Sequence, residues 1–107
     1  MTATGLEIRD AIFAIVDVET TGLTPEDRIT EVAALRIRGD IVLDRFQSLV
    51  NPQIHIPMVA AAVSGIDDAM VADAPKFSQV WPSLERVLAG AVLVAHNAPF
   101  DLHFLSA

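Results

Sequence analysis

Residues 12–22 read Ile-Phe-Ala-Ile-Val-Asp-Val-Glu-Thr-Thr-Gly, an apolar run that ends in two acids and a turn. The run at residues 12–16 consists mainly of β-forming residues, which predicts a strand buried on both faces. Gly22 and Pro25 are residue types that punctuate turns, so residues 20–25 should end this strand. We therefore expect the stretch to begin a sheet and to present its acids where the strand ends.

Two further strands are expected to continue the sheet as an antiparallel meander. Residues 29–37 partly alternate between apolar and other side chains, which predicts the second strand. The side chains expected on one face of it are Ile29, Glu31, Ala33, Leu35 and Ile37. Gly39 and Asp40 form a hairpin signal, and residues 41–50 supply the third strand.

Short helical segments are expected after the meander. Pro57 is a favourable start for a helix over residues 58–63, and Gly65 is its natural stop. Asp67 or Asp68 is expected to cap another short helical turn, because Asp side chains accept hydrogen bonds from free amides at helix starts.

The last third of the chain should add a helix, a strand and the start of another helix. Apolar residues at helical spacing predict a helix over residues 77–88, kinked by Pro82 and ended by Gly90. Residues 91–95 are uniformly apolar, which indicates a central strand, and residues 96–99 begin a further helix. That helix has no capping residue before the terminus, so we expect the chain to be cut within its fold.

Composition limits the class of protein. The chain has 107 residues, of which 52% are hydrophobic and 20% charged, which indicates one packed domain or part of one. Its net charge of −7 argues against a protein that coats nucleic acid by neutralising many phosphates. The charge is compatible with carboxylates that bind metal ions. The apolar runs are too short to span a bilayer, which needs about 20 residues. No secretory signal is present at the start, so we expect no membrane partner and a cytoplasmic location.

Three carboxylates are the candidate chemical groups. Asp17 and Glu19 are two positions apart on a strand, so both should point to one face, where a divalent cation would relieve their repulsion. Oxygen ligands favour Mg²⁺ or Mn²⁺. Asp101 follows the expected central strand by one short turn, where ligands gather in open α/β sheets. Spacing alone leaves two alternatives open. Asp17 and Glu19 could be solvated acids at the end of a strand, and Asp101 could be an acid that complements a helix dipole.

Longer stretches around these acids resemble one enzyme family. Residues 13–23 resemble the first motif, and residues 93–101 the second, of the DnaQ-like (DEDDh) 3′→5′ exonucleases. This superfamily includes the proofreading epsilon subunit of bacterial DNA polymerase III. The resemblance implies an α/β fold of the ribonuclease H-like kind, a mixed sheet with three antiparallel strands, then a parallel strand, and flanking helices. Residues 1–107 would be the N-terminal portion of such an exonuclease domain.

The resemblance also implies a chemistry. Its members use two metal ions, Mg²⁺ or Mn²⁺, to direct water onto the terminal phosphodiester and release nucleoside monophosphates from a 3′ end. Carried over, Asp17 would bridge both metals, Glu19 would hold the metal that bears the water, and Asp101 the metal near the leaving group. The substrate would be the single-stranded 3′ end of DNA, with RNA as the alternative. A DNA polymerase or another replication or repair protein would be a partner.

Further residues take roles from the same resemblance. The 3′-terminal nucleotide would be held by Thr20, Thr21, Gly22, Leu23, Asn97 and Phe100. Leu23 and Phe100 are equally compatible with ordinary core packing. Glu31 and His96 would support the metal ligands through hydrogen bonds, with a solvated acid as the alternative for Glu31.

The family's third motif, which carries a general-base His and a fourth carboxylate, has no counterpart in residues 1–107. His55 falls in a loop between prolines, His96 ends a strand and His103 points away from Asp101 on a helix, so none is a convincing base. Ser64 stands where several relatives carry a His that reaches the substrate. We expect the chain alone to be inactive and to self-associate through an open sheet edge. A non-catalytic docking module is the alternative from another class.

Overall fold

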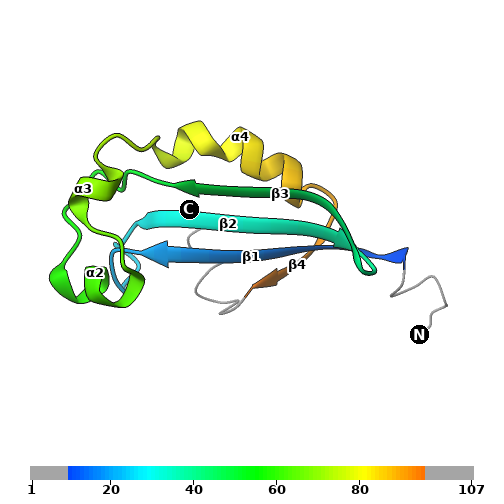
Figure 1. Ribbon diagram of the computed structural model, residues 1–107, viewed down its shortest axis with the longest axis horizontal. Helices are drawn as coiled ribbons and strands as arrows, with labels where there is room; N and C mark the ends of the chain where they lie inside the picture. Colours follow the sequence, from blue (N-terminus) through cyan, green and yellow to red (C-terminus); the bar gives the residue numbers. More distant parts are fainter. Residues whose placement is uncertain (1–9, 96–107) are drawn as a thin grey trace.

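The computed structural model describes residues 10–95, which form a mixed four-stranded sheet with helices on one face and at one end (Figure 1). The elements are β1 (Ile12–Thr20), β2 (Ile29–Arg38), β3 (Ile41–Leu49), α2 (Met58–Ser64), α3 (Asp68–Val71), α4 (Phe77–Leu88) and β4 (Val92–Ala95). The strand order is β3-β2-β1-β4. β1 to β3 form the expected antiparallel meander, and β4 pairs with β1 in parallel.

One face of the sheet forms the core, and α4 covers it. Alternation along β1 sends Val16 and Val18 to this face, where both are buried. α4 contributes Leu84 and Val87, which are 0% and 1% exposed and belong to the same cluster. Arg36 of β2 fastens the end of α4, because its guanidinium donates to the carbonyl oxygens of Val87 at 2.9 Å and Ala89 at 2.7 Å.

The opposite face of the sheet is only partly covered, so the expectation that residues 12–16 are buried on both faces is wrong. Ile15 points to this face and is 41% exposed. Its neighbour across the parallel pairing, Val94, is 44% exposed, and Val92 is 55% exposed. Residues 91–95 were expected to be a central strand with a further element beside it, and within residues 10–95 β4 pairs with β1 alone. A further neighbour for β4 therefore stays a prediction.

The face expected for the second strand is confirmed for four of its five residues. Val32 and Ala34 form the core side of β2, and the opposite face carries Glu31, Ala33, Leu35 and Ile37. Ile29 nevertheless reaches the core, because the register shifts between Glu19 and Thr20 and leaves one extra residue in β2. Such a bulge reverses the inward and outward order of side chains on either side of it.

The helix signals in the sequence are confirmed. Pro57 precedes α2, and Gly65 ends it with φ 78°, a left-handed conformation that glycine adopts without a steric penalty. Asp67 caps α3, where its side chain accepts from the amide of Met70 at 3.0 Å. α4 begins and ends as expected, with Pro82 inside it. The helix expected after residue 95 lies outside the described residues, and no helix between residues 10 and 95 is long and apolar enough to cross a membrane.

Two buried threonines give a test of this packing. Thr30 is 0% exposed, and its hydroxyl has no hydrogen-bond partner among residues 10–95, whereas Thr21 is 1% exposed and its hydroxyl has two. Thr30→Val should therefore raise the free energy of unfolding by about 1 kcal/mol, because it removes a buried polar group without a partner. Thr21→Val is the matched control and should lower it by about 1–3 kcal/mol. Urea unfolding measures both, and equal destabilisation would contradict the assignment.

Candidate functional site

Asp17 and Glu19 lie on the exposed face of the sheet, near the carboxyl end of β1. Both point away from the α4-covered core, as their spacing predicts; Asp17 is exposed and Glu19 half-buried. Glu31 of β2 lies directly opposite Glu19 in the antiparallel register. Its carboxylate accepts a hydrogen bond of 2.6 Å from the side-chain amide of Gln47. The fold thus brings three carboxylates to one end of an open sheet face.

The three carboxylates offer oxygen ligands, and all three carry a negative charge. Like charges directly opposite each other on neighbouring strands are unfavourable, and Glu19 and Glu31 are such a pair. A hard divalent cation would offset that repulsion. Between residues 10 and 95, however, no group of three or more His, Cys, Asp or Glu side chains is placed to hold one metal ion. Asp101, the third predicted ligand, lies outside the described residues, as do His96, Asn97, Phe100 and His103.

A cavity of about 530 Å³ lies beside the acidic end of β1. The loop after β1 forms one wall and α2 the other. Its lining residues are Val18, Glu19, Thr20, Thr21, Gly22, Leu23, Thr24, Asp27, Pro57, Val59, Ala60, Val63 and Ser64. None of these residues is Lys or Arg, and although half of the lining side chains are polar, the surface exposed to the cavity is mainly apolar. The cavity therefore suits a flat, largely apolar group that lies close to a carboxylate.

The loop wall contains all the substrate-contacting residues predicted from the first motif. Thr20, Thr21, Gly22 and Leu23 line the cavity together. Leu23 is 87% exposed, so it does not pack into the core that residues 10–95 form. Thr20 shapes the turn, since its hydroxyl donates to the carbonyl oxygen of Gly22 at 2.6 Å.

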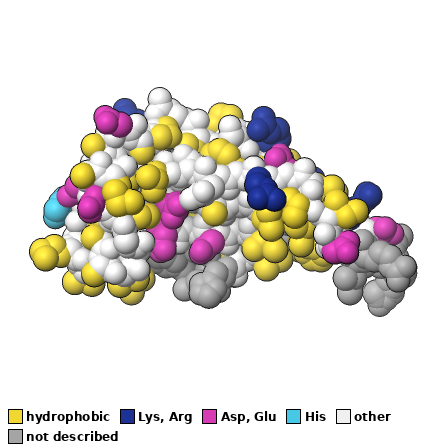
Figure 2. All heavy atoms as spheres, in the orientation of Figure 1, with side chains coloured by type: hydrophobic (Ala, Val, Ile, Leu, Met, Phe, Trp, Pro, Cys, Tyr) yellow, Lys and Arg dark blue, Asp and Glu magenta, His cyan; other side chains and the backbone are white. Residues whose placement is uncertain are grey.

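The α2 wall is apolar and solvent-exposed. Val59 and Val63 lie one helical turn apart and are 77% and 81% exposed, although both line the cavity. Figure 2 shows hydrophobic side chains gathered at this end of the molecule. Ser64 also lines the cavity, but its hydroxyl donates to the carbonyl oxygen of Ala60 at 3.0 Å and accepts from the amide of Ile66 at 3.1 Å.

Asp27 lines the cavity but was absent from the residues predicted from the sequence. Its carboxylate accepts from the hydroxyl of Thr21 at 2.6 Å and from the hydroxyl of Thr24 at 2.7 Å. These bonds, led by that of Thr21, lower the pKa of Asp27 from its ordinary value of 3.8, so the carboxylate stays charged at neutral pH. An Asp just after a Thr-rich turn is a weak signal, since such residues serve many loops.

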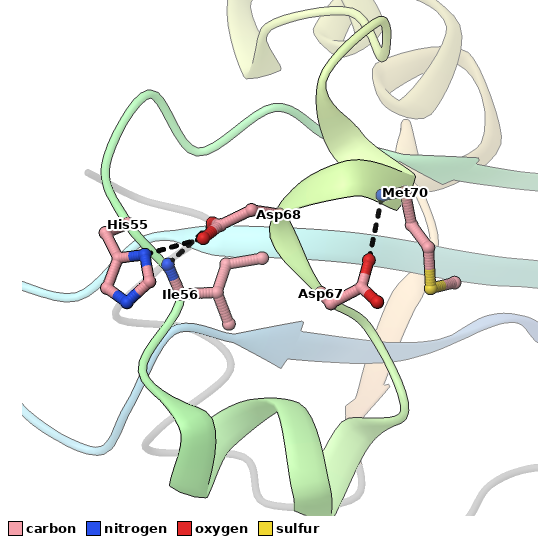
Figure 3. Close-up of polar contacts among 5 residues, drawn as sticks. All are labelled: His55, Ile56, Asp67, Asp68 and Met70. Atoms are coloured by element: carbon pink, nitrogen blue, oxygen red, sulfur yellow. Dashed lines mark hydrogen bonds and ion pairs between the residues drawn. The ribbon is translucent and has the colours of Figure 1, made fainter.

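The side chain of His55 contacts a carboxylate and does not line the cavity. Its Nδ1 lies 2.6 Å from the carboxylate of Asp68, at the start of α3 (Figure 3). The other oxygen of Asp68 accepts from the amide of Ile56 at 2.9 Å. Figure 3 shows this carboxylate bridging the segment that leads into α2 and the segment that begins α3. This clamp, formed by His55, Ile56 and Asp68, therefore joins the two segments that flank α2, the helix that forms one wall of the cavity.

Comparison with known proteins gives a consistent result. Residues 14–107 match the RNase_T exonuclease family. A protein of Mycobacterium tuberculosis, named as a bifunctional exonuclease/endonuclease, is 43% identical over 109 residues, which cover 95% of this chain and 17% of the relative. A DNA polymerase III subunit epsilon-like protein of Rhodobacter capsulatus is 48% identical over 97 residues, which cover 87% of this chain and 14% of the relative.

Solved structures agree with these relatives. Exonuclease X, solved in complex with 5′ overhanging duplex DNA, superposes with a TM-score of 0.74 at 34% sequence identity. The superposition covers 86% of this chain and 52% of that one. The chain therefore spans about half of that structure and less than a fifth of the two curated relatives.

The clamp at Asp68 gives a pH prediction. The amide of Ile56 is the largest cause that lowers the pKa of Asp68 from its ordinary value of 3.8, and His55 adds to it. Because the pKa is lower in the folded chain, the stabilisation is complete above 3.8 and is lost as the pH falls through the folded value. The amide proton shift of Ile56, followed by NMR, should titrate with a midpoint below 3.8, and Asp68→Asn should abolish that step. A midpoint above 3.8 would contradict the clamp.

Proposed function

The chain belongs to the RNase_T exonuclease family, and from this premise we propose that it carries the metal site and nucleotide pocket of a 3′→5′ DNA exonuclease. The reaction is hydrolysis of the terminal phosphodiester by a two-metal mechanism, which releases nucleoside monophosphates. The observation that carries the proposal is the position of the Asp17–Glu19 pair on an open sheet face, beside an apolar cavity that Glu19 also lines.

The residues present fit divalent metal ions. Asp17 and Glu19 offer hard oxygen ligands from one strand face, and Asp101 is proposed to complete the set. Bound Mg²⁺ or Mn²⁺ would supply Lewis acidity and an activated water. Glu31 is proposed to support the metal-binding carboxylates through hydrogen bonds. It lies opposite Glu19, and its own carboxylate accepts a hydrogen bond from Gln47. His96 is assigned the same supporting role.

The cavity would hold the terminal nucleoside. Leu23 lies on the loop wall, and Val59 and Val63 on the α2 wall, so a base inserted between them would contact apolar side chains on both sides. Asn97 and Phe100 are proposed to complete this pocket. Gly22 lines the same loop wall as Leu23, and the space that a side chain would need there is taken by the carboxylate of Asp27. Since no described lining residue is cationic, the phosphate is proposed to be held by the metal ions that the acids would bind.

DNA is the proposed substrate. Exonuclease X, the relative with 34% identity, was solved with a DNA duplex that has a 5′ overhang. The epsilon-like relative carries the name of a DNA polymerase III subunit. We propose a polymerase or another replication or repair protein as the partner, and a cytoplasmic location. RNA remains the alternative substrate.

The general base is proposed to come from the whole protein. His55 is held by Asp68 and does not line the cavity. The chain covers only 14% and 17% of its two curated relatives, which leaves room in such proteins for the third motif. We therefore expect residues 1–107 to bind metal weakly and to show no turnover.

The metal site is tested by removing one ligand. Asp17→Ala should abolish Mn²⁺ binding in isothermal titration calorimetry, because it removes a carboxylate that is proposed to hold the metal, and Asp101→Ala should weaken binding. Asp40→Ala, in the turn between β2 and β3, removes the same charge away from the site and should leave binding unchanged.

Unchanged Mn²⁺ binding in Asp17→Ala would overturn the metal-site assignment.

The substrate is tested by the same titration with Mn²⁺ and short single strands of thymidine or uridine nucleotides. Tighter binding of the thymidine strand supports DNA, and tighter binding of the uridine strand supports RNA. Binding of neither strand, with Mn²⁺ bound, would indicate a docking module in place of an enzyme.

The edge formed by β4 is proposed to associate with a second copy. Val92, Leu93 and Val94 expose apolar surface there, and unpaired strand edges recruit further strands. Light scattering should show a molar mass that rises with concentration, and Val94→Lys should reduce it. Val63→Lys, at the 81% exposed position on α2, is the control for added charge. A monomer at all concentrations would contradict association at this edge.

A further inference from the structure

The loop between β1 and β2 is held from inside by one carboxylate. Asp27 accepts from the Thr21 hydroxyl through Oδ1 at 2.6 Å, and from the Thr24 amide at 3.0 Å and hydroxyl at 2.7 Å through Oδ2. The amide of Asp27 in turn donates to the carbonyl oxygen of Thr24 at 3.1 Å. Both carboxylate oxygens are thus occupied by donors of the same loop.

Thr21 connects this carboxylate to the base of the loop. Its hydroxyl donates to Asp27 and accepts from the amide of Arg28 at 3.0 Å, while its own amide donates to the carbonyl oxygen of Arg28 at 2.9 Å. Thr21 is 1% exposed, so its hydroxyl depends on these two bonds and has no access to water in their place.

The carboxylate of Asp27 also lies against Gly22, which has no side chain in its way. A Cβ at position 22 would lie 2.5 Å from Oδ2 and 2.8 Å from Cγ of Asp27, far inside van der Waals contact. The carboxylate of Asp27 therefore supports the backbone of Gly22 from the side. The next residue is Leu23, which is 87% exposed at the cavity, so the support acts on the residue adjacent to the proposed base-contacting side chain.

We infer that Asp27 is a positioning residue for the nucleotide pocket, which fixes Gly22 and Leu23 through Thr21 and Thr24. The inference rests on the proposed function and adds a residue that none of the predicted roles includes. Asp27 is not assigned to the metal ions, because loop donors occupy both of its oxygens, and within residues 10–95 it joins no three-residue group suited to a metal. Its lowered pKa, caused mainly by Thr21, keeps it an acceptor for these donors.

Binding of thymidine monophosphate separates this role from a metal-binding role. Asp27→Asn keeps the size of the side chain but replaces one acceptor oxygen with a donor, so it should weaken nucleotide binding about tenfold in the presence of Mn²⁺. Binding of Mn²⁺ alone should stay within about twofold of the wild type. Glu26→Gln removes the same charge from the adjacent residue, which does not line the cavity, and should leave both affinities unchanged.

A double-mutant cycle tests whether Asp27 acts through its neighbour. Thr24→Val removes one hydroxyl donor to Asp27, and its loss of affinity should not add to that of Asp27→Asn. Additive losses would overturn action through Thr24. Gly22→Ala should reproduce the Asp27→Asn loss, because its methyl group displaces the carboxylate.

A second readout needs no ligand. In Asp27→Asn the ¹⁵N order parameters of Gly22 and Leu23 should fall, whereas those of β1 and α4 should not change and Glu26→Gln should match the wild type. Unchanged order at Gly22 and Leu23, or full nucleotide affinity in a folded Asp27→Asn protein, would overturn the positioning role and leave the proposed function standing. Loss of the proposed function would appear instead as Mn²⁺ binding that survives Asp17→Ala.

Discussion

The two-residue period of β1 is the constraint on which the rest of the structure depends. Because successive side chains alternate, the strand that sends Val16 and Val18 under α4 must send Asp17 and Glu19 to the other face. The same alternation along β1 therefore fixes which residues pack in the core and which face the carboxylates occupy. A shift by one residue would bury both carboxylates and expose the core, so the hydrophobic cluster itself keeps the acids in place.

The order of elements could be read from the sequence because its signals are local. Glycine and proline mark the turns, helical spacing marks α4, and Asp67 caps α3. The faces were harder to assign. Whether residues 12–16 are covered on one side or both depends on which segments return to the sheet, and the switch of Ile29 to the core depends on a bulge between paired strands. Neither is encoded in the spacing of a single strand.

The candidate site was predictable to the same extent. Residues 20–23 could be assigned to the pocket from their motif, and the structure places all four at one cavity. The opposite wall, with Val59 and Val63, was not predicted, since exposed valines on a short helix look like ordinary surface until α2 is placed beside the loop. Asp27 was missed because its partners are defined by a folded turn and not by a repeating interval.

The parallel pairing of β4 with β1 has a consequence for how the chain folds. Ala14 pairs with Leu93, so the contact spans 79 positions (14 to 93), whereas the meander of β1, β2 and β3 is joined by short turns. Closing a long loop costs more entropy than closing a hairpin. During synthesis the meander emerges well before β4, so we expect the hairpins to form first and β4 to join after β1, β2 and β3. Until then, the edge of β1 beside the acids has no β4 paired to it.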